Sequence, residues 1–483
     1  MSSRTRFRHL ALVPARLRRT GLSRPARLIT AVVGAVALSL LAGCSSSSSS
    51  ASSAASSPAS SAAASASPSV TVVAGGSCSS SSATKITFWA WVPGMGRAVT
   101  EFNKTHPNIC VTQEDVGAGD PEYVAITNAL KAGSGAPDVA EVEFDELPSF
   151  EVTHNVVNLV PYGANNYKSD FTTWAWDEVS QGSAVYAMPG DSGPVAFYYN
   201  TDELAKYNIT PPTTWAQFAT DAATLHKDDP SAYMTNFSAV DLQWVMSLMA
   251  QANAWPFAYS GGSNVTIDWT GQAQMAFAKY WQNLLAAHEV NATTDVSATS
   301  FADLDKGIDA SWISSAWGPS YFAPDAKSSI GDWRATALPQ WTAGADVAAN
   351  WGGSTYPVFS TSQHPAQAAE FAEWLNGTTA SWDITKTAPS SLFPTFLPLL
   401  NNPSFKDTTV ALSGSSTPDV AFSAAASSIQ GVQWPPFMTE ALNEASTVFA
   451  GVMNGKETLQ AAFTSFQNVL VSYAKAQGFN VST

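Results

Sequence analysis

Three short apolar stretches alternate with helical patterns between residues 85 and 144, and this alternation limits the possible folds more than any other feature. The segments KITFWAW (85–91), ICVTQEDV (109–116) and PDVAEVEF (137–144) each predict a β-strand. The segments between them, 96–106 and 121–135, have apolar residues at helical spacing. This order indicates βαβ units and an α/β fold built on a parallel sheet. Ligands of such sheets bind at the carboxyl ends of the strands.

Three later segments predict helices with clear ends. In PPTTWAQFATDAATL (211–225), Thr214 and Gln217 have the spacing of a capping box. The segment 364–377 begins near a proline and stops at a glycine. The segment 457–478 keeps apolar residues at steps of three and four up to its final glycine. Helical segments therefore continue to the end of the chain.

The first 43 residues have the features of an export signal. Residues 1–27 carry eight arginines and no acidic residue, and the uncharged run 28–42 is shorter than the roughly 20 residues of a membrane-spanning helix. Leu41-Ala42-Gly43-Cys44 resembles a bacterial lipobox, whose cysteine receives a diacylglycerol and becomes the first mature residue. An ordinary signal peptide with a chance cysteine is the alternative. We predict a lipoprotein signal peptide at 1–43 and a lipid anchor at Cys44.

A segment rich in Ser and Ala follows, from 44 to 83. Such a composition cannot bury enough apolar surface to fold, so we predict a disordered tether. The body that follows is too long for one core and predicts two domains. A protein of this design is exported and anchored by lipid at the outer face of a bacterial cell membrane.

The mature chain is strongly acidic. Without the eight signal arginines, 15 Lys and Arg remain against 38 Asp and Glu. Nucleic acid needs clustered Lys and Arg, so it is not expected as a partner, and an anionic ligand is also disfavoured. The six histidines lack the spacing of metal ligands and no P-loop occurs. We therefore predict neither a metal nor another cofactor.

Two cysteines remain once Cys44 is assigned to lipid. Cys78 precedes the first predicted strand, and Cys110 lies near the start of the second. Neighbouring parallel strands begin side by side, which suits the Cα separation of about 4.4–6.8 Å that a disulfide requires. In an oxidising compartment, this even pair predicts a disulfide between Cys78 and Cys110.

The segment MPGDSGPVAFYYN (188–200) is similar to the nucleophile loop of a trypsin-like serine protease. That loop has two glycines between its Ser and Pro, whereas only Gly193 separates Ser192 from Pro194. A catalytic triad also needs a histidine and a carboxylate placed with the serine, and trypsin-like folds are all-β. The histidines here are scattered, and strands alternate with helices. We therefore predict that Ser192 is not a nucleophile and that the chain is not an enzyme.

Several motifs occur in a characteristic order: ITFWAW…FNKTHPNICV, APDV, VYAMPGDSGPVAFYYNTDEL…NITPPTTWAQF, WGGSTYPVFSTSQHPAQAAEFAEWL and the closing helix. This set resembles the extracellular solute-binding proteins of ABC importers, in the large sugar-binding family that includes the maltose-binding protein. It covers about residues 85 to 479. The resemblance implies two α/β lobes joined by a hinge, each a mostly parallel sheet flanked by helices. It also implies a monomer, a ligand between the lobes, and a membrane permease that recognises the closed form.

The resemblance also gives a domain map. Lobe one is expected to hold 84–194 and 357–400, and lobe two 198–350 and 401–483. The crossings are expected near 193–197, 351–357 and 394–402. In this family, PGDSGP would form a loop at the mouth of the cleft, where its glycines and proline shape the turn.

Aromatic and acidic residues outside the helices indicate the kind of ligand. An indole face covers the apolar face of a sugar ring, while carboxylates bind the hydroxyls around its edge. Suitable residues stand beside Gly or Pro, at predicted strand ends, and in the crossing loops. The predicted binding residues are Trp89, Trp91, Glu143, Asp145, Asp191, Trp255, Trp317, Trp351 and Gly353. By contrast, we expect Glu141 and Glu146 to face water, and Trp215, Trp281 and Trp374 to lie in the core.

The predicted function is capture of a neutral sugar, in particular an oligosaccharide, for delivery to the permease. Two alternatives stay open. One is another solute, such as a polyamine, a peptide or a glycerol phosphate, and the other is a secreted lipoprotein glycosidase. Glycosidases place paired carboxylates on opposite sides of the scissile bond. The acidic cluster at 141–146 comes from one strand end, which suits hydroxyl binding better.

Overall fold

The computed structural model describes residues 71–73, 78, 80–387, 392–406, 411–414 and 416–483. All of them lie in one compact unit, 66–483. The predicted signal peptide, Cys44 and most of the predicted tether lie outside the described residues. Within the described ranges, no helix combines the length and the apolar character needed to cross a bilayer.

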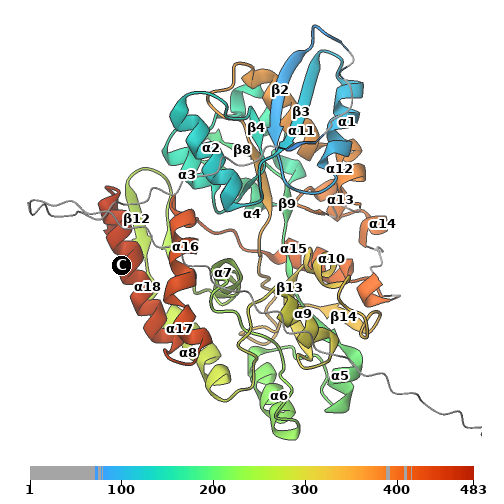
Figure 1. Cartoon of the computed structure of the whole chain (residues 1–483), viewed down its shortest axis with the longest axis vertical. Coiled ribbons are helices and arrows are strands. Elements are labelled where there is room, and N and C mark those ends of the chain that lie inside the picture. The colour runs from blue at the N-terminus through green and yellow to red at the C-terminus, as the bar shows by residue number, and fades with distance from the viewer. Residues whose placement is uncertain (1–70, 74–77, 79, 388–391, 407–410, 415) are drawn as a thin grey trace, which may run out of the picture. The chain divides into compact units, whose positions relative to one another are not determined.

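The first sheet contains the strands predicted near the start of the body. β2 (Thr84–Trp89) is parallel to both β3 (Ile109–Asp115) and β4 (Val139–Ala140), in the order β3-β2-β4. Helices α1 (Met95–Thr105) and α2 (Asp120–Ala132) connect these strands (Figure 1). The prediction of βαβ units is confirmed here, and the carboxyl ends of the strands meet at one edge of the sheet.

A fourth strand extends this sheet where the sequence predicts a disordered tether. β1 (Thr71–Val73) pairs antiparallel with β3, with Thr71 opposite Asp115 and Val73 opposite Gln113. The prediction of disorder is wrong for these residues, because Thr and Val favour strands and the outer edge of β3 offers unpaired backbone groups. Further along, a disulfide joins Cys78 to Cys110 of β3, and their Cα atoms are 5.4 Å apart.

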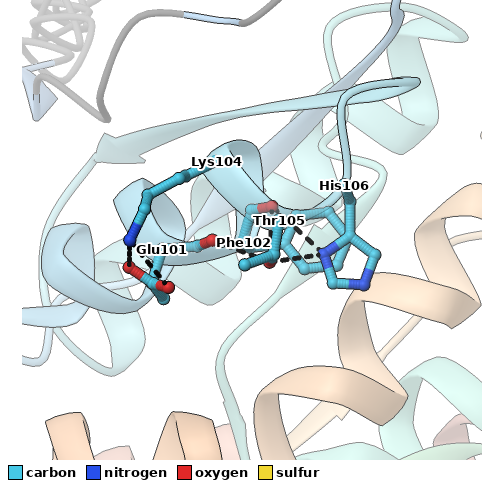
Figure 2. A network of polar contacts seen from close by, with 5 residues as sticks. All are labelled: Glu101, Phe102, Lys104, Thr105 and His106. Atoms are coloured by element: carbon cyan, nitrogen blue, oxygen red, sulfur yellow. Dashed lines mark hydrogen bonds and ion pairs between the residues drawn. The ribbon is translucent and has the colours of Figure 1, made fainter.

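Helix α1 ends in a small network of polar contacts (Figure 2). Lys104 forms an ion pair with Glu101 at 3.1 Å, and the Thr105 hydroxyl donates to the Glu101 carbonyl at 2.8 Å. The His106 ring stacks on Phe102, with ring centroids 4.0 Å apart. The His106 N–H donates to the Phe102 carbonyl at 2.8 Å, which satisfies one of the carbonyls that a helix end leaves unpaired.

Two smaller groups of strands lie beyond the carboxyl edge of the first sheet. β15 (Ser354–Pro357) lies between β5 (Val142–Glu143) and β8 (Ala187–Pro189) and is antiparallel to both. β9 (Asp191–Ser192) pairs antiparallel with β16 (Phe393–Pro394). The PGDSGP segment is therefore held by strands from two distant parts of the chain.

The next sheet corrects one prediction. β10 (Val195–Asn200) lies between β13 (Ser311–Ser315) and β14 (Trp333–Thr336) and is antiparallel to both. The expectation of a mostly parallel sheet is wrong here. β10 continues directly from the PGDSGP loop, whereas β13 and β14 run back towards that loop, so only those two strands share a direction. The α/β class and the mixture of helix and sheet hold.

Buried side chains form two hydrophobic cores. The first core surrounds the first sheet and includes Phe88 and Phe371, whereas the second includes Trp215 and Phe463. Trp215 and Trp281 are fully buried, as predicted, while Trp374 is only partly buried against the first core. We call the zone where the two cores meet around the carboxyl edge of β2 and β4 the seam.

Strand β10 contributes to both cores. Alternate residues of a strand point to opposite faces, and Val195 and Phe197 face the second core while Ala196 and Tyr198 face the first. Its sheet is therefore buried on both faces and fixes the two cores against each other.

The helices predicted from capping signals are present. α6 (Trp215–Asp228) begins where the Thr214 hydroxyl accepts a hydrogen bond from the Gln217 backbone N–H at 3.1 Å. The Gln217 side chain accepts from the Thr213 N–H at 3.1 Å, so the reciprocal half of the predicted box is shifted by one residue. α11 (Pro365–Gly377) and α18 (Leu459–Ala476) match the other two predictions.

The remaining elements surround these sheets and cores. The other helices are α3 (Leu147–Val152), α4 (Thr173–Glu178), α5 (Thr201–Lys206), α7 (Leu242–Gln251), α8 (Gln272–Ala286), α9 (Ala298–Asp305), α10 (Gly318–Phe322), α12 (Thr379–Thr385), α13 (Leu397–Leu400), α14 (Pro403–Lys406), α15 (Asp419–Ser428), α16 (Met438–Val448) and α17 (Ala450–Met453). The 3-10 helices are Val160–Tyr162, Ala164–Asp170 and Ala411–Ser413. The last strands are β6 (Ser180–Gln181), β7 (Ala184–Val185), β11 (Phe257–Ala258), β12 (Asn264–Ile267) and β17 (Asn480–Ser482).

Candidate functional site

The carboxyl edge of the first sheet is organised around Glu141. Its Oε2 accepts hydrogen bonds from the backbone N–H groups of Trp91 and Val92, both at 3.2 Å. Its Oε1 accepts from the Ser354 hydroxyl at 3.1 Å. The expectation that Glu141 faces water is wrong, because these donors draw its side chain inward and leave it fully buried. Burial, and then the charge of Asp191, raise the pKa of Glu141 to about 8.

Asp191 lies next to this group. Its Oδ1 accepts from the Ser354 N–H at 3.1 Å, and burial raises the pKa of Asp191 to about 7. Gly353 makes this approach possible. Its φ is +110°, and a Cβ added there would lie 2.8 Å from the Asp191 carbonyl oxygen. The Ser192 hydroxyl donates to the Phe393 carbonyl at 3.3 Å.

Glu143 forms a pair with Tyr123, a residue that the sequence analysis missed. The Tyr123 hydroxyl donates to Glu143 Oε2 at 3.1 Å and accepts from the Glu143 N–H at 3.1 Å. The ring of Trp91 meets Tyr123 edge-on, with centroids 6.0 Å apart. Burial, and then the charge of Asp145, raise the pKa of Glu143 well above its usual range. Trp91, Tyr123 and Glu143 therefore form one continuous group.

Two tryptophans from the second core meet this group. The Trp317 indole N–H donates to the Trp351 carbonyl at 3.0 Å, and their rings pack edge-on at 4.4 Å. Gly352, at a φ of +80°, lies between them and the carboxylate. A Cβ added to Gly352 would be 3.4 Å from Trp317 Nε1 and 3.8 Å from Glu143 Oε1. These are ordinary contact distances, so it is the positive φ that favours glycine here, and Gly352 places an indole and a carboxylate on either side of one backbone position.

Hydrogen bonds cross the seam beside this group. Gln243, at the start of α7, donates to Asp145 at 2.7 Å, and the Thr439 hydroxyl of α16 donates to Glu146 at 2.9 Å. The expectation that Glu146 faces water is also wrong, since this bond holds it at 1% exposure. Burial raises the pKa of Asp145 to about 6. Burial, and then the charge of Asp145, raise that of Glu146 to about 8.

A second aromatic group lies at the other end of α7. Trp255 donates its indole N–H to the Gln433 carbonyl at 3.2 Å and packs edge-on against Trp434 at 4.7 Å. The Trp434 indole donates to Glu178 at 2.8 Å, and the Val432 N–H donates to the same carboxylate at 2.9 Å. Burial raises the pKa of Glu178 to about 8. This group also joins the two sides of the seam.

The predicted residues thus fall into three places. Around Glu143 and Gly352, the structure brings together Trp91, Glu143, Asp145, Asp191, Trp317, Trp351 and Gly353. Trp255 lies apart, near Glu178. Trp89 lies in the first core at 7% exposure, and its indole N–H donates to Glu114 at 2.9 Å. The ligand-binding role of all nine residues stays a prediction.

The residues that sequence reasoning missed come from two kinds of position. Gln243 lies two residues after Asp241, whose side chain caps α7, so a capping signal marks the start of that helix. Trp434 precedes two prolines, the same kind of context that singled out Trp255. Tyr123, Glu178 and Thr439 lie within helices, and nothing in their local sequence separates them from core or surface residues.

Among the described residues, the ion pairs do not include the seam carboxylates, although Lys131 lines a pocket beside Thr439. Ion pairs that join described residues are surface pairs within single helices, such as Lys206 with Glu203 at 2.6 Å. The seam carboxylates are bonded instead by neutral donors, namely amides, hydroxyls, indoles and backbone N–H groups. The described residues contain no group of three or more His, Cys, Asp or Glu side chains arranged to hold a metal ion. Chemically, the site can accept hydrogen bonds from hydroxyls and stack against apolar ring faces.

Comparisons with known proteins agree with this arrangement. Residues 92–381 match the model of the family described as bacterial extracellular solute-binding protein. A lactose-binding protein of Rhizobium radiobacter is 27% identical over 323 residues, covering 61% of this chain and 71% of the relative. An arabinooligosaccharide-binding protein of Bacillus subtilis is 24% identical over 323 residues, covering 63% and 73%.

Solved structures show the same fold. An ABC transporter associated binding protein from B. animalis subsp. lactis, in complex with β-1,6-galactobiose, has a TM-score of 0.70 and 27% identity. The galacto-N-biose/lacto-N-biose I-binding protein of Bifidobacterium longum has a TM-score of 0.72 and 22% identity. Each comparison covers 83% of this chain and 100% of the other. The chain is therefore a two-lobed protein that belongs to the bacterial extracellular solute-binding protein family.

Proposed function

We propose that this chain is the substrate-binding component of an ABC importer. It captures a neutral sugar at the seam, in particular an oligosaccharide, and delivers it to a membrane permease without chemical change. The observation that carries this proposal is the bond between Asp145 and Gln243 at 2.7 Å, which joins a strand end of the first core to a helix of the second. A hydroxyl-rich ligand that replaced this direct bond would be bound by both groups, one from each side.

The chemistry of the surrounding residues supports a neutral sugar. Trp91 and Trp317 offer indole rings close to the carboxylate of Glu143. Carboxylates accept hydrogen bonds from sugar hydroxyls, and the amide of Gln243 supplies both a donor and an acceptor. An anionic solute would meet several carboxylates here, and none of the ion pairs among the described residues places a cation beside them. The relatives that bind lactose, arabinooligosaccharide or galactobiose support the same class of ligand.

Binding from two sides would couple the ligand to the hinge. Each side alone makes part of the contacts, so only the closed form makes all of them, and the ligand shifts the population towards that form. The proposed lobes are 84–194 with 357–400 and 198–350 with 401–483, and the chain would bend where it crosses between them. The permease would then recognise the closed form.

We propose the location of the protein separately, on the basis of its first 44 residues. Cleavage before Cys44 and lipidation of that cysteine would anchor a monomer to the outer face of the cell membrane through the segment 44–70. Cys44→Ala should abolish both steps. Mass spectrometry of the exported protein tests this, and an unmodified mature N-terminus at another position would contradict it.

Calorimetry tests the proposed binding. Lactose, β-1,6-galactobiose and an arabinooligosaccharide serve as probes, and each is recovered and checked for cleavage. Trp317→Ala should weaken the best of them by about 1–3 kcal/mol, by analogy with aromatic stacking on bases, which is roughly 5- to 150-fold in Kd. Trp341→Ala is the matched control, because Trp341 packs against Trp215 and Tyr280. No binding of any probe, or release of cleaved sugar, would overturn the proposal.

A further inference from the structure

A groove of about 610 Å³ lies at one end of the seam, and we call it the distal groove. It is lined by residues of α4, by the end of α7 and by the segment 429–433. Its volume is within the range of small-molecule sites. Its main side chains are Trp174, Glu178, Asn253, Trp255, Gln430 and Gln433.

Helix α7 sets the distance between this groove and the central site. Gln243, which donates to Asp145, lies in the first turn of α7, whereas Ala250 at its end lines the distal groove. Seven residues of helix rise by about 10 Å. Phe144, beside Asp145, packs against Trp174 of the groove, with ring centroids 5.3 Å apart. The two places therefore lie along the same seam, too far apart for one sugar ring to fill both.

The chemistry of the distal groove resembles that of the central site. Trp255 is half-buried and is held edge-on by Trp434, which fixes the plane of its ring. Gln433 is exposed, and within the described part of the chain its side-chain NH₂ donates to no residue. Asn253 is exposed beside it, at a φ of +53°. An indole ring with free amides around it suits another ring that carries hydroxyls.

Glu178 keeps the distal groove in shape. Both of its oxygens accept hydrogen bonds, one from Val432 and one from Trp434. These bonds tie α4 to residues 432 and 434, so the groove is defined by a fixed contact. The amides, the indole and the exposed carboxylate of Asp177, which also lines the groove, are the groups that face a ligand.

We propose that the distal groove binds the far end of an oligosaccharide whose near end displaces the direct bond between Asp145 and Gln243. The groove then selects for chain length, since a disaccharide fills the central site alone and a longer chain gains the stacking contact with Trp255. This inference rests on the proposed function, because it assumes that a sugar occupies the central site.

The test measures affinity against chain length by calorimetry. The probes are β-1,6-linked galacto-oligosaccharides of two, three and four units. In the unaltered protein, affinity should rise from the dimer to the tetramer. Trp255→Ala should reduce the ratio of tetramer to dimer affinity by roughly 5- to 150-fold, the loss of one stacking contact. Trp341→Ala, a surface tryptophan outside the groove, should leave that ratio unchanged.

Because Trp255 also packs against Trp434, its removal could disturb the local fold, and a second variant that keeps Trp255 is needed. Ala250→Phe fills the groove from a half-buried helix position and should lower tetramer affinity while leaving dimer affinity within about twofold. If the dimer binds and neither variant changes the ratio, the distal groove is not a subsite and the proposed function stands. If no oligosaccharide binds the unaltered protein, the proposed function fails and this inference fails with it.

Discussion

The two sides of the seam have opposite chemistry. The side built on the first sheet supplies carboxylates at strand ends, including Glu141, Glu143 and Asp145. The side built on the second core supplies Trp317 and Gln243, an indole and a neutral amide. Neither side alone would surround a sugar, because the carboxylates come mainly from the first side and the amide of Gln243 and the indole of Trp317 come from the second. The difference explains why closure would be needed for tight binding.

We call the side built on the first sheet the acidic side and the side built on the second core the aromatic side. The acidic side bears an electrostatic cost that the aromatic side does not. Its carboxylates are buried near one another without ion-paired cations, so their pKa values rise. Donors from the other side, such as Gln243 and Thr439, partly offset this cost when the sides meet. A ligand rich in hydroxyls would do the same. The following predictions test this division, from the largest expected effect to the smallest.

The first prediction concerns covalent support, which only the acidic side has. The disulfide between Cys78 and Cys110 closes a loop of 32 residues, worth roughly 3–4 kcal/mol in the chain-entropy model. Replacing both cysteines by serine should lower the free energy of unfolding by that amount in denaturant titrations. Sugar affinity should stay the same, because Cys110 lies in β3 at the amino end of the sheet. Two free thiols in the exported native protein would contradict the pairing.

The second prediction removes a carboxylate from the acidic side. Asp145→Ala deletes the acceptor that faces Gln243 and should weaken sugar binding by about 1.5–3 kcal/mol, the usual worth of a hydrogen bond to a charged group. This corresponds to a rise in Kd of roughly 10- to 150-fold. Asp325→Ala is the control, since Asp325 is an exposed residue that follows the end of α10. Equal affinities for both variants would place the ligand elsewhere.

The third prediction uses pH to measure what the burial of a carboxylate on the acidic side costs in stability. Burial raises the pKa of Glu141 from 4.5 to about 8, so the folded protein holds a proton that the unfolded chain has released between these values. Its contribution to stability is therefore fully present below about pH 4.5 and declines as the pH rises towards 8. The melting temperature should fall over this range.

Glu141→Gln isolates this contribution. The amide oxygen can still accept from Trp91 and Val92, and its NH₂ can donate to Ser354. The melting temperature of this variant should depend less on pH than that of the unaltered protein. Glu370→Gln is the matched control, because Glu370 is exposed on α11. If both variants keep the original pH dependence, Glu141 does not titrate as its burial implies.

The sequence predicted the acidic side better than the aromatic side, for a physical reason. Local patterns mark strand ends, so the positions of Glu143 and Asp145 followed from the βαβ alternation. The antiparallel direction of β10 depends on where distant strands return, which no local pattern records. Burial of Glu141 and Glu146 likewise depends on donors from residues 354 and 439, more than 200 positions away. Partners at that separation are set by tertiary structure alone.

The smallest effect is expected at Ser192, in the loop between the two sides. Its hydroxyl is buried and donates to the Phe393 carbonyl at 3.3 Å, where β9 meets β16. Ser192→Ala removes one neutral hydrogen bond, so stability should fall by about 0.5–1.5 kcal/mol. Sugar affinity should stay within about twofold, because the hydroxyl contacts the strand pair and not the seam. Asp191→Ala, one residue away, should weaken binding, since its carboxylate holds Ser354 beside Glu141. Equal losses of affinity in the two variants would show that the whole loop, and not the carboxylate, supports the ligand.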